Sequence, residues 1–115
     1  LMSISHFALD NVTVIVDRNR YQLDGATDDI MNLFPLEDKF KAFGFDVQTV
    51  DGHNLGAIAD ALAKESEKPE VIIADTVKAN GISFLMNNKM SHHTPLVGKK
   101  YVQAVEDIKR AYGKL

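Results

Sequence analysis

Three short apolar runs along the chain predict three β-strands. Residues 12–16 and residues 71–74 are almost continuously apolar and rich in β-branched side chains, which is typical of strands that are buried on both faces. Between them, residues 45–50 alternate between apolar and polar side chains, and Asp51 and Gly52 follow at once. This alternation predicts the remaining strand, which ends at a turn.

The segments between these runs have helical spacing. Leu36, Phe40 and Phe43 lie at positions i, i+4 and i+7, and Gly44 is placed to end that helix. Asn54 is suited to cap a second helix. The apolar face expected for the second helix consists of Leu55, Ile58, Ala59 and Leu62.

A closing helix follows the polar segment of residues 78–100, so strands and helices alternate along the chain. Such alternation predicts an α/β fold with a parallel sheet and right-handed crossovers. Parallel sheets bind ligands beside the carboxyl ends of their strands. The loops that leave these ends are residues 17–25, 51–54 and 75–93, and they hold the unusual polar residues of the chain. We therefore expect the functional site at this edge of the sheet.

Length and charge narrow the class of protein. A chain of 115 residues suits one compact domain. The net charge is −3 and no basic stripe is visible, so we do not expect a nucleic acid partner. Cysteine is absent, and no apolar run approaches the roughly 18 residues of a membrane span. We expect a cytoplasmic protein without a membrane partner.

The loop at residues 17–25 offers oxygen ligands for a metal ion. Asp17, Asn19 and Asp24 lie within it, and magnesium prefers oxygen ligands, few of them from protein. The alternative is an ordinary turn, because Asn and Asp before Gly are common turn residues. Spacing alone leaves both interpretations open.

Two adjacent histidines, His92 and His93, lie in the third loop before Pro95. Neighbouring side chains in a loop rarely bind one zinc ion, and no cysteine or carboxylate is close in sequence. A histidine at the carboxyl edge of a sheet can instead donate to a phosphate or exchange protons near neutral pH. The alternative is a pair of solvated loop histidines.

Several segments in order resemble the transketolase family. Val16-Asp17-Arg18-Asn19, followed by Gln22-Leu23-Asp24-Gly25, resembles the second half of the thiamine diphosphate motif of that family. The segments that resemble the family further along are residues 42–47, 50–53, 73–78 and 81–84 and a histidine before Pro95. The first half of the motif, an acidic Gly-Asp-Gly, does not occur in this sequence. The resemblance spans nearly the whole chain.

The resemblance implies a fold and a set of roles. Residues 1–115 would form the C-terminal part of the diphosphate-binding domain, a three-layer α/β fold with a parallel sheet. Asn19 would bind magnesium, or calcium in its place, through its side chain, and Tyr21 through its backbone carbonyl. Leu23 and Val77 would pack on the thiazolium ring of thiamine diphosphate. His92, or alternatively His93, would reach the diphosphate and the reacting centre.

The resemblance also implies an enzyme that needs partner chains. Transketolases are transferases that move a two-carbon ketol unit from a ketose phosphate to an aldose phosphate. Partner chains of a split or cleaved enzyme would supply the Gly-Asp-Gly half-motif and the pyrimidine-binding domain, and the isolated chain would be inactive. One alternative is a non-catalytic scaffold or regulatory component. Another is a different carboligase that uses thiamine diphosphate, such as a dihydroxyacetone, deoxyxylulose-phosphate or acyloin synthase.

Two further features bear on these alternatives. Ala79-Asn80-Gly81 stands where many transketolases carry Gly-Lys-Gly, which favours the scaffold slightly. Leu1, Ile4 and Ala8 have helical spacing, but no capping residue precedes them. We therefore expect this segment to be the later part of a helix. A sheet that lacks strands leaves apolar edges to be covered. We therefore expect obligate association, with residues 1–9 near the contact.

Overall fold

The computed structural model describes residues 1–113, which fall into two compact units. The first unit contains Leu1–Asn19 and Asn32–Thr76. The second contains Arg20–Met31 and the chain from Val77 onward. The loop expected to carry the metal ligands therefore begins in one unit and continues in the other.

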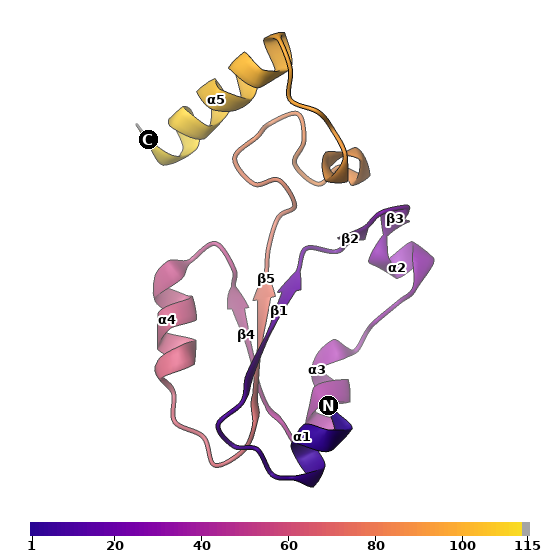
Figure 1. The fold of residues 1–115 in the computed structure, drawn as a ribbon, viewed down its shortest axis with the longest axis vertical. Helices are drawn as coiled ribbons and strands as arrows, with labels where there is room; N and C mark the ends of the chain where they lie inside the picture. The colour runs from indigo at the N-terminus through magenta and orange to yellow at the C-terminus, as the bar shows by residue number, and fades with distance from the viewer. Residues whose placement is uncertain (114–115) are drawn as a thin grey trace. The chain divides into compact units, whose positions relative to one another are not determined.

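The first unit is a parallel sheet between two layers of helices (Figure 1). Its strands are β1 (Thr13–Arg18), β4 (Asp46–Asp51) and β5 (Glu70–Asp75), in the order β1-β5-β4. The helices on one face are α1 (Met2–His6) and α3 (Leu36–Ala42), and α4 (Leu55–Ala63) lies on the other. This arrangement confirms the expected α/β fold with a parallel sheet.

All three strands end at the same edge of the sheet. Arg18 of β1 and Asp51 of β4 are both in register with Asp75 of β5. The backbone N–H of Gly52 donates to the carbonyl of Asp75 at 2.7 Å, so the turn after β4 is held against the end of β5. The carboxyl edge predicted from the alternation of elements is therefore present.

The core lies between the sheet and the layer of α1 and α3. Its buried side chains are Phe40, Phe45, Val71 and Ile73. Strand β5 is buried on both faces, as its sequence predicts, whereas β1 alternates between exposed and half-buried positions. The prediction that residues 12–16 are buried on both faces is wrong, because β1 is an edge strand and Ile15 remains 56% exposed.

The sequence predicts the ends of the helices better than it predicts their buried faces. Gly44, at φ +84°, follows the end of α3, and the Asn54 side chain caps α4 by accepting from the N–H of Ala57 at 3.1 Å. The predicted apolar face of α4 is correct only at Ile58, which is half-buried. Leu55, Ala59 and Leu62 are exposed, and Ala61 is buried instead. Small side chains let the helix approach β4 closely, where the Gln48 amide donates to the Ala61 carbonyl at 3.1 Å.

The second unit has little regular structure besides one long helix. Its elements are β2 (Tyr21–Gln22), β3 (Gly25–Ala26), α2 (Thr27–Ile30), the 3₁₀ helix η1 (Lys89–His92) and α5 (Lys99–Tyr112). Strands β2 and β3 form an antiparallel hairpin that the sequence does not predict. Within residues 1–113, no helix has the length and apolar character needed to cross a membrane.

Candidate functional site

A network of charged side chains occupies the carboxyl edge of the sheet. Arg18, the last residue of β1, keeps only 12% of its side chain exposed. Its Nε and Nη2 donate to the two carboxylate oxygens of Asp75 at 2.6 and 2.7 Å, and its Nη1 donates to Glu37 of α3 at 2.6 Å. The hydrogen bonds with Asp75, and secondarily those with Glu37, raise the pKa of Arg18 above its ordinary value.

The network extends from Arg18 to β4 and to the segment that contains Phe34 and α3. The Thr49 hydroxyl of β4 donates to Glu37 at 3.3 Å, and the Phe34 ring centroid lies 5.8 Å from the Arg18 guanidinium carbon. The pKa of Glu37 lies below its ordinary value, first because its own backbone N–H donates to it and next because Arg18 does. The ends of β1 and β5 are thus joined to α3 by charge-assisted hydrogen bonds, which are stronger than neutral ones.

The three oxygen ligands predicted in the loop have different surroundings. Asp17 lies within β1 and accepts a hydrogen bond from the Thr76 hydroxyl. Asp24 occupies the two-residue turn between β2 and β3, which confirms the turn interpretation for that residue. Asn19 is half-buried and directly follows the last residue of β1.

The backbone bends sharply after Asn19. Arg20 has φ +62°, in the left-handed region that a residue with a side chain seldom occupies, and Tyr21 then begins β2. The backbone carbonyl of Arg20 accepts from the N–H of Thr27 at 3.0 Å. Such strained residues cluster at functional sites, where the surrounding structure imposes the conformation.

The donor set fits magnesium in kind but not in number. Side-chain amide and backbone carbonyl oxygens, as at Asn19 and Tyr21, are hard ligands of the type that magnesium prefers. In residues 1–113, no three His, Cys, Asp or Glu residues lie close enough together to hold a metal ion. Magnesium usually takes few protein ligands and completes its shell with water and phosphate. The oxygens of Asn19 and Tyr21 are therefore suitable in kind for magnesium, and any further ligands would have to come from other groups.

The loop after β5 repeats the sharp bend seen after β1. Val77 is half-buried, Ala79 has φ +57° and Gly81 has φ +89°. A Cβ atom on Gly81 would lie 2.7 Å from a ring carbon of Tyr112 and 3.0 Å from the Cδ1 of Ile108. Gly81 therefore meets both requirements for glycine, a positive φ and a close approach to the helix.

The remaining predicted site residues are more exposed. Leu23 lies in the hairpin turn with 54% of its surface exposed. His92 ends η1 and His93 follows it, both exposed, with ring centroids 4.4 Å apart in an edge-to-face arrangement. Both histidines are accessible to a ligand or to solvent, so the geometry is compatible with either interpretation of the pair.

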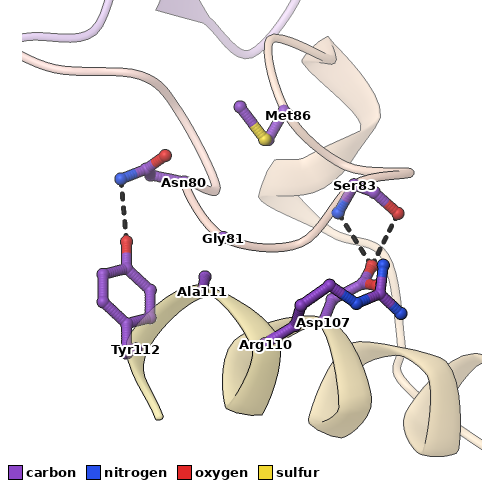
Figure 2. Close-up of a pocket in the computed structure, with 8 residues that line it drawn as sticks. All are labelled: Asn80, Gly81, Ser83, Met86, Asp107, Arg110, Ala111 and Tyr112. Carbon is purple, nitrogen blue, oxygen red and sulfur yellow. Dashed lines mark hydrogen bonds and ion pairs between the residues drawn. The ribbon is translucent and has the colours of Figure 1, made fainter.

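Hydrogen bonds join the loop of residues 78–88 to α5. The loop and the helix together line an open hollow of about 400 Å³. Figure 2 shows Ser83 directed at the buried Asp107, whose carboxylate accepts from the Ser83 N–H at 2.9 Å and hydroxyl at 2.6 Å. These hydrogen bonds, the hydroxyl one first, lower the pKa of Asp107. The Asn80 amide donates to the Tyr112 hydroxyl at 2.8 Å.

The sequence patterns do not predict two of these contacts, the one between Asp107 and Ser83 and the one between Arg18 and Asp75. Asp107 stands three residues after the buried Ala104 on α5, and an acidic residue on the buried side of a helix is a signal that it has a partner. The pairing of Arg18 with Asp75 depends on the register of β1 against β5. Sequence patterns alone do not provide that register.

Known proteins resemble this chain over most of its length. Residues 2–114 match the family described as the thiamine diphosphate binding domain of transketolase. The 6-deoxy-6-sulfo-D-fructose transketolase subunit SqwG of Clostridium sp. (strain MSTE9) is 39% identical over 105 residues, which cover 89% of this chain and 38% of that subunit. One subunit of the apulose-4-phosphate transketolase of Actinobacillus succinogenes is 36% identical over 110 residues, covering 94% and 40% respectively.

The structure gives the same result. The crystal structure of the transketolase of Campylobacter jejuni superimposes with a TM-score of 0.84 at 33% identity, covering 93% of this chain and 17% of that one. The chain thus spans about two fifths of the length of the two similar subunits. On the match of residues 2–114, the chain belongs to the transketolase family and represents its thiamine diphosphate binding domain.

Proposed function

We propose that this chain is a component of an enzyme that depends on thiamine diphosphate and magnesium and transfers a two-carbon ketol unit between sugar phosphates. The position of Asn19 carries the proposal. It directly follows β1 at the carboxyl edge of a parallel sheet, where such sheets bind ligands. It also lies in the part of the chain that matches a thiamine diphosphate binding domain.

In this proposal, Asn19 binds the metal ion through its side-chain oxygen and Tyr21 through its backbone carbonyl. Leu23 and Val77 hold the thiazolium ring away from bulk water. His92, or alternatively His93, donates to the diphosphate and exchanges a proton with the substrate. Thiamine diphosphate, when bound, supplies the carbanion chemistry, while the protein supplies binding, orientation and electrostatics.

Partner chains complete the site. The donor set at Asn19 and Tyr21 covers one side of a metal ion, so the acidic ligand of the Gly-Asp-Gly half-motif comes from elsewhere. Strand β1 is an edge strand, and its Ile15 is exposed. Met2 of α1 is 75% exposed, and Phe7, which follows α1, is 67% exposed. Exposed apolar residues along an open sheet edge favour a protein partner at β1 and α1.

The proposal is tested by reconstitution. The chain is produced alone and together with the polypeptides that copurify with it, and thiamine diphosphate binding and ketol transfer are measured in each sample over a range of magnesium concentrations. We expect both properties in the assembly and neither in the chain alone. The proposal fails if the purified assembly binds no thiamine diphosphate at any magnesium concentration.

The substrate panel for this assay follows from the similar subunits. One of them is named for a sulfonated sugar and the other for a sugar phosphate. The panel therefore contains anionic ketoses of both kinds, together with the donors of dihydroxyacetone, deoxyxylulose-phosphate and acyloin synthases. If the assembly used only donors of the second group, we would replace the proposed transketolase activity with another carboligase activity.

A second candidate function is a non-catalytic scaffold or regulatory component. Asn80 favours it, because it stands where many transketolases carry lysine and its amide donates to Tyr112 at 2.8 Å. A neutral side chain held by the helix supplies no cation to a diphosphate. An Asn19→Ala assembly with an unchanged rate of ketol transfer would support the scaffold and remove the metal role.

A further inference from the structure

Three of the five N–H groups of the Arg18 guanidinium donate to carboxylates. Its Nε and Nη2 grip Asp75 in a bidentate pair, and its Nη1 binds Glu37. Only 12% of the side chain is exposed. Because a bidentate pair fixes orientation as well as distance, Arg18 and Asp75 hold each other in one orientation at the carboxyl edge.

Further contacts strengthen the same junction. Arg18 and Asp75 are register partners at the ends of β1 and β5, and the N–H of Thr76 donates to the Arg18 carbonyl at 3.3 Å. The Thr76 hydroxyl also binds the carboxylate of Asp17. The last two residues of β1 are therefore tied to residues 75–76 by backbone and side chains alike. Asn19 is the next residue of the chain.

We infer that Arg18 is a positioning residue, which fixes the end of β1 and so the direction in which Asn19 leaves the sheet. This inference rests on the proposed metal-binding role of Asn19. We do not assign Arg18 as the cation for a diphosphate, because three of its N–H groups already donate to Asp75 and Glu37. By pairing these two carboxylates it also lowers the negative potential at an edge that is to receive a diphosphate.

The test uses the complete assembly, with thiamine diphosphate and magnesium chloride as probes. The magnesium concentration at half-saturation of cofactor binding is measured by near-ultraviolet circular dichroism. Residues that orient a metal ligand typically contribute 10- to 100-fold to metal affinity, so Arg18→Met is expected to raise this concentration by about that factor. Arg110→Met is the matched control, since Arg110 is 78% exposed on α5, and it is expected to leave the value unchanged.

Arg18→Lys separates positioning from simple charge. Lysine keeps the positive charge but lacks the planar fork that binds both oxygens of Asp75. If Arg18 acts by positioning, the loss of magnesium affinity in Arg18→Lys should be nearly as large as the loss in Arg18→Met. Full rescue by lysine would overturn the inference, because it would show that only the charge matters.

Hydrogen exchange of the assembly without cofactor provides a second readout. The expected result for Arg18→Met is faster exchange at the amides of Gly52 and Thr76, which bond to the ends of β5 and β1. Exchange at the centre of β5, around Ile72, is expected to stay unchanged. Equal acceleration at all these amides would indicate a loss of global stability and overturn the positioning role.

The two proposals fail in different ways. If the wild-type assembly binds no thiamine diphosphate, the proposed function fails. If the wild type binds it and Arg18→Met binds it with the same magnesium dependence, only the positioning role fails. Should Arg18→Met not assemble, Asp75→Asn carries the same test, since asparagine keeps the volume but gives up the charge. An unchanged magnesium dependence in Asp75→Asn would again overturn the inference.

Discussion

Strands β1 and β5 have similar sequences but different surroundings. Val14-Ile15-Val16 and Val71-Ile72-Ile73 are both β-branched runs, and the two strands pair in parallel along their full length. In β5 all three of these side chains are fully buried, whereas Ile15 in β1 is 56% exposed. The difference is one of position, because β5 is central in the sheet and β1 is at its edge.

An apolar strand that is exposed on one face lacks a neighbour on that face. A sequence like that of β1 predicts burial on both faces, and in residues 1–113 only one face is covered. The similar subunits are more than twice as long as this chain. The uncovered face of β1 is the surface that the proposed function assigns to a partner, and the following predictions test this contrast with β5.

Truncation in β5 is expected to have the largest effect. Ile73 has no exposed surface and packs in the core with Phe40 and Phe45. Ile73→Ala removes buried methyl groups and leaves a cavity, which typically costs about 2–5 kcal/mol of unfolding free energy. Urea denaturation of the chain measures the change. A loss below about 1 kcal/mol would show that β5 is not the centre of the core.

The equivalent change in β1 should act on assembly instead. We expect Ile15→Ala to change the unfolding free energy of the chain by less than about 0.5 kcal/mol, as for other exposed positions. Ile15→Asp places a charge at the proposed contact and is expected to weaken partner binding by about 2 kcal/mol or more. Analytical ultracentrifugation with the partner measures binding. Normal association of Ile15→Asp would place the contact elsewhere.

The bends after the two strands give a smaller effect. Ala79 has φ +57°, where a side chain costs roughly 1–2 kcal/mol. Ala79→Gly relieves this strain, but it also raises the conformational entropy of the unfolded chain, which opposes folding. We therefore expect a net stabilisation of about 0.5 kcal/mol. Thermal denaturation is the measurement. A lower midpoint for Ala79→Gly would indicate that the left-handed conformation does not strain the chain.

The smallest effect concerns pH at the junction of β1 and β5. The pKa of Glu37 is lowered in the folded chain, by its own backbone N–H and then by Arg18. A lowered folded pKa gives stability that is fully present above the unfolded value of about 4.3 and is lost as the pH falls through the folded value. Comparing urea midpoints of wild type and Glu37→Gln from about pH 7 to pH 3 measures this loss. Parallel curves for the two proteins would contradict it.

Much of the fold could be predicted from the sequence because its signals are local. The cap at Asn54, the glycine after α3 and the parallel sheet implied by alternating elements are each encoded in short stretches of the chain. The exposure of Ile15 and the face of α4 could not be predicted, since both depend on which neighbour is present. The hairpin of β2 and β3 has only two residues in each strand, too few for a periodic pattern.

The candidate site was predictable only as a location. Asn19 follows a strand at the carboxyl edge, and this could be inferred from the alternation of elements. The partners of Arg18 could not, because Asp75 and Glu37 lie 57 and 19 residues away in the chain. Long-range pairs of this kind depend on register and on the placement of α3, neither of which a local pattern specifies.

The metal-binding role proposed for Asn19 is measured by the magnesium-dependent binding of thiamine diphosphate to the assembly. Isothermal titration compares the wild type with Asn19→Ala, which removes the side-chain oxygen, and with the control Gln103→Ala, which removes an exposed amide on α5. We predict saturable binding for the wild type and the control, and binding at least about tenfold weaker for Asn19→Ala at low magnesium. Equal binding by all three proteins would contradict the account.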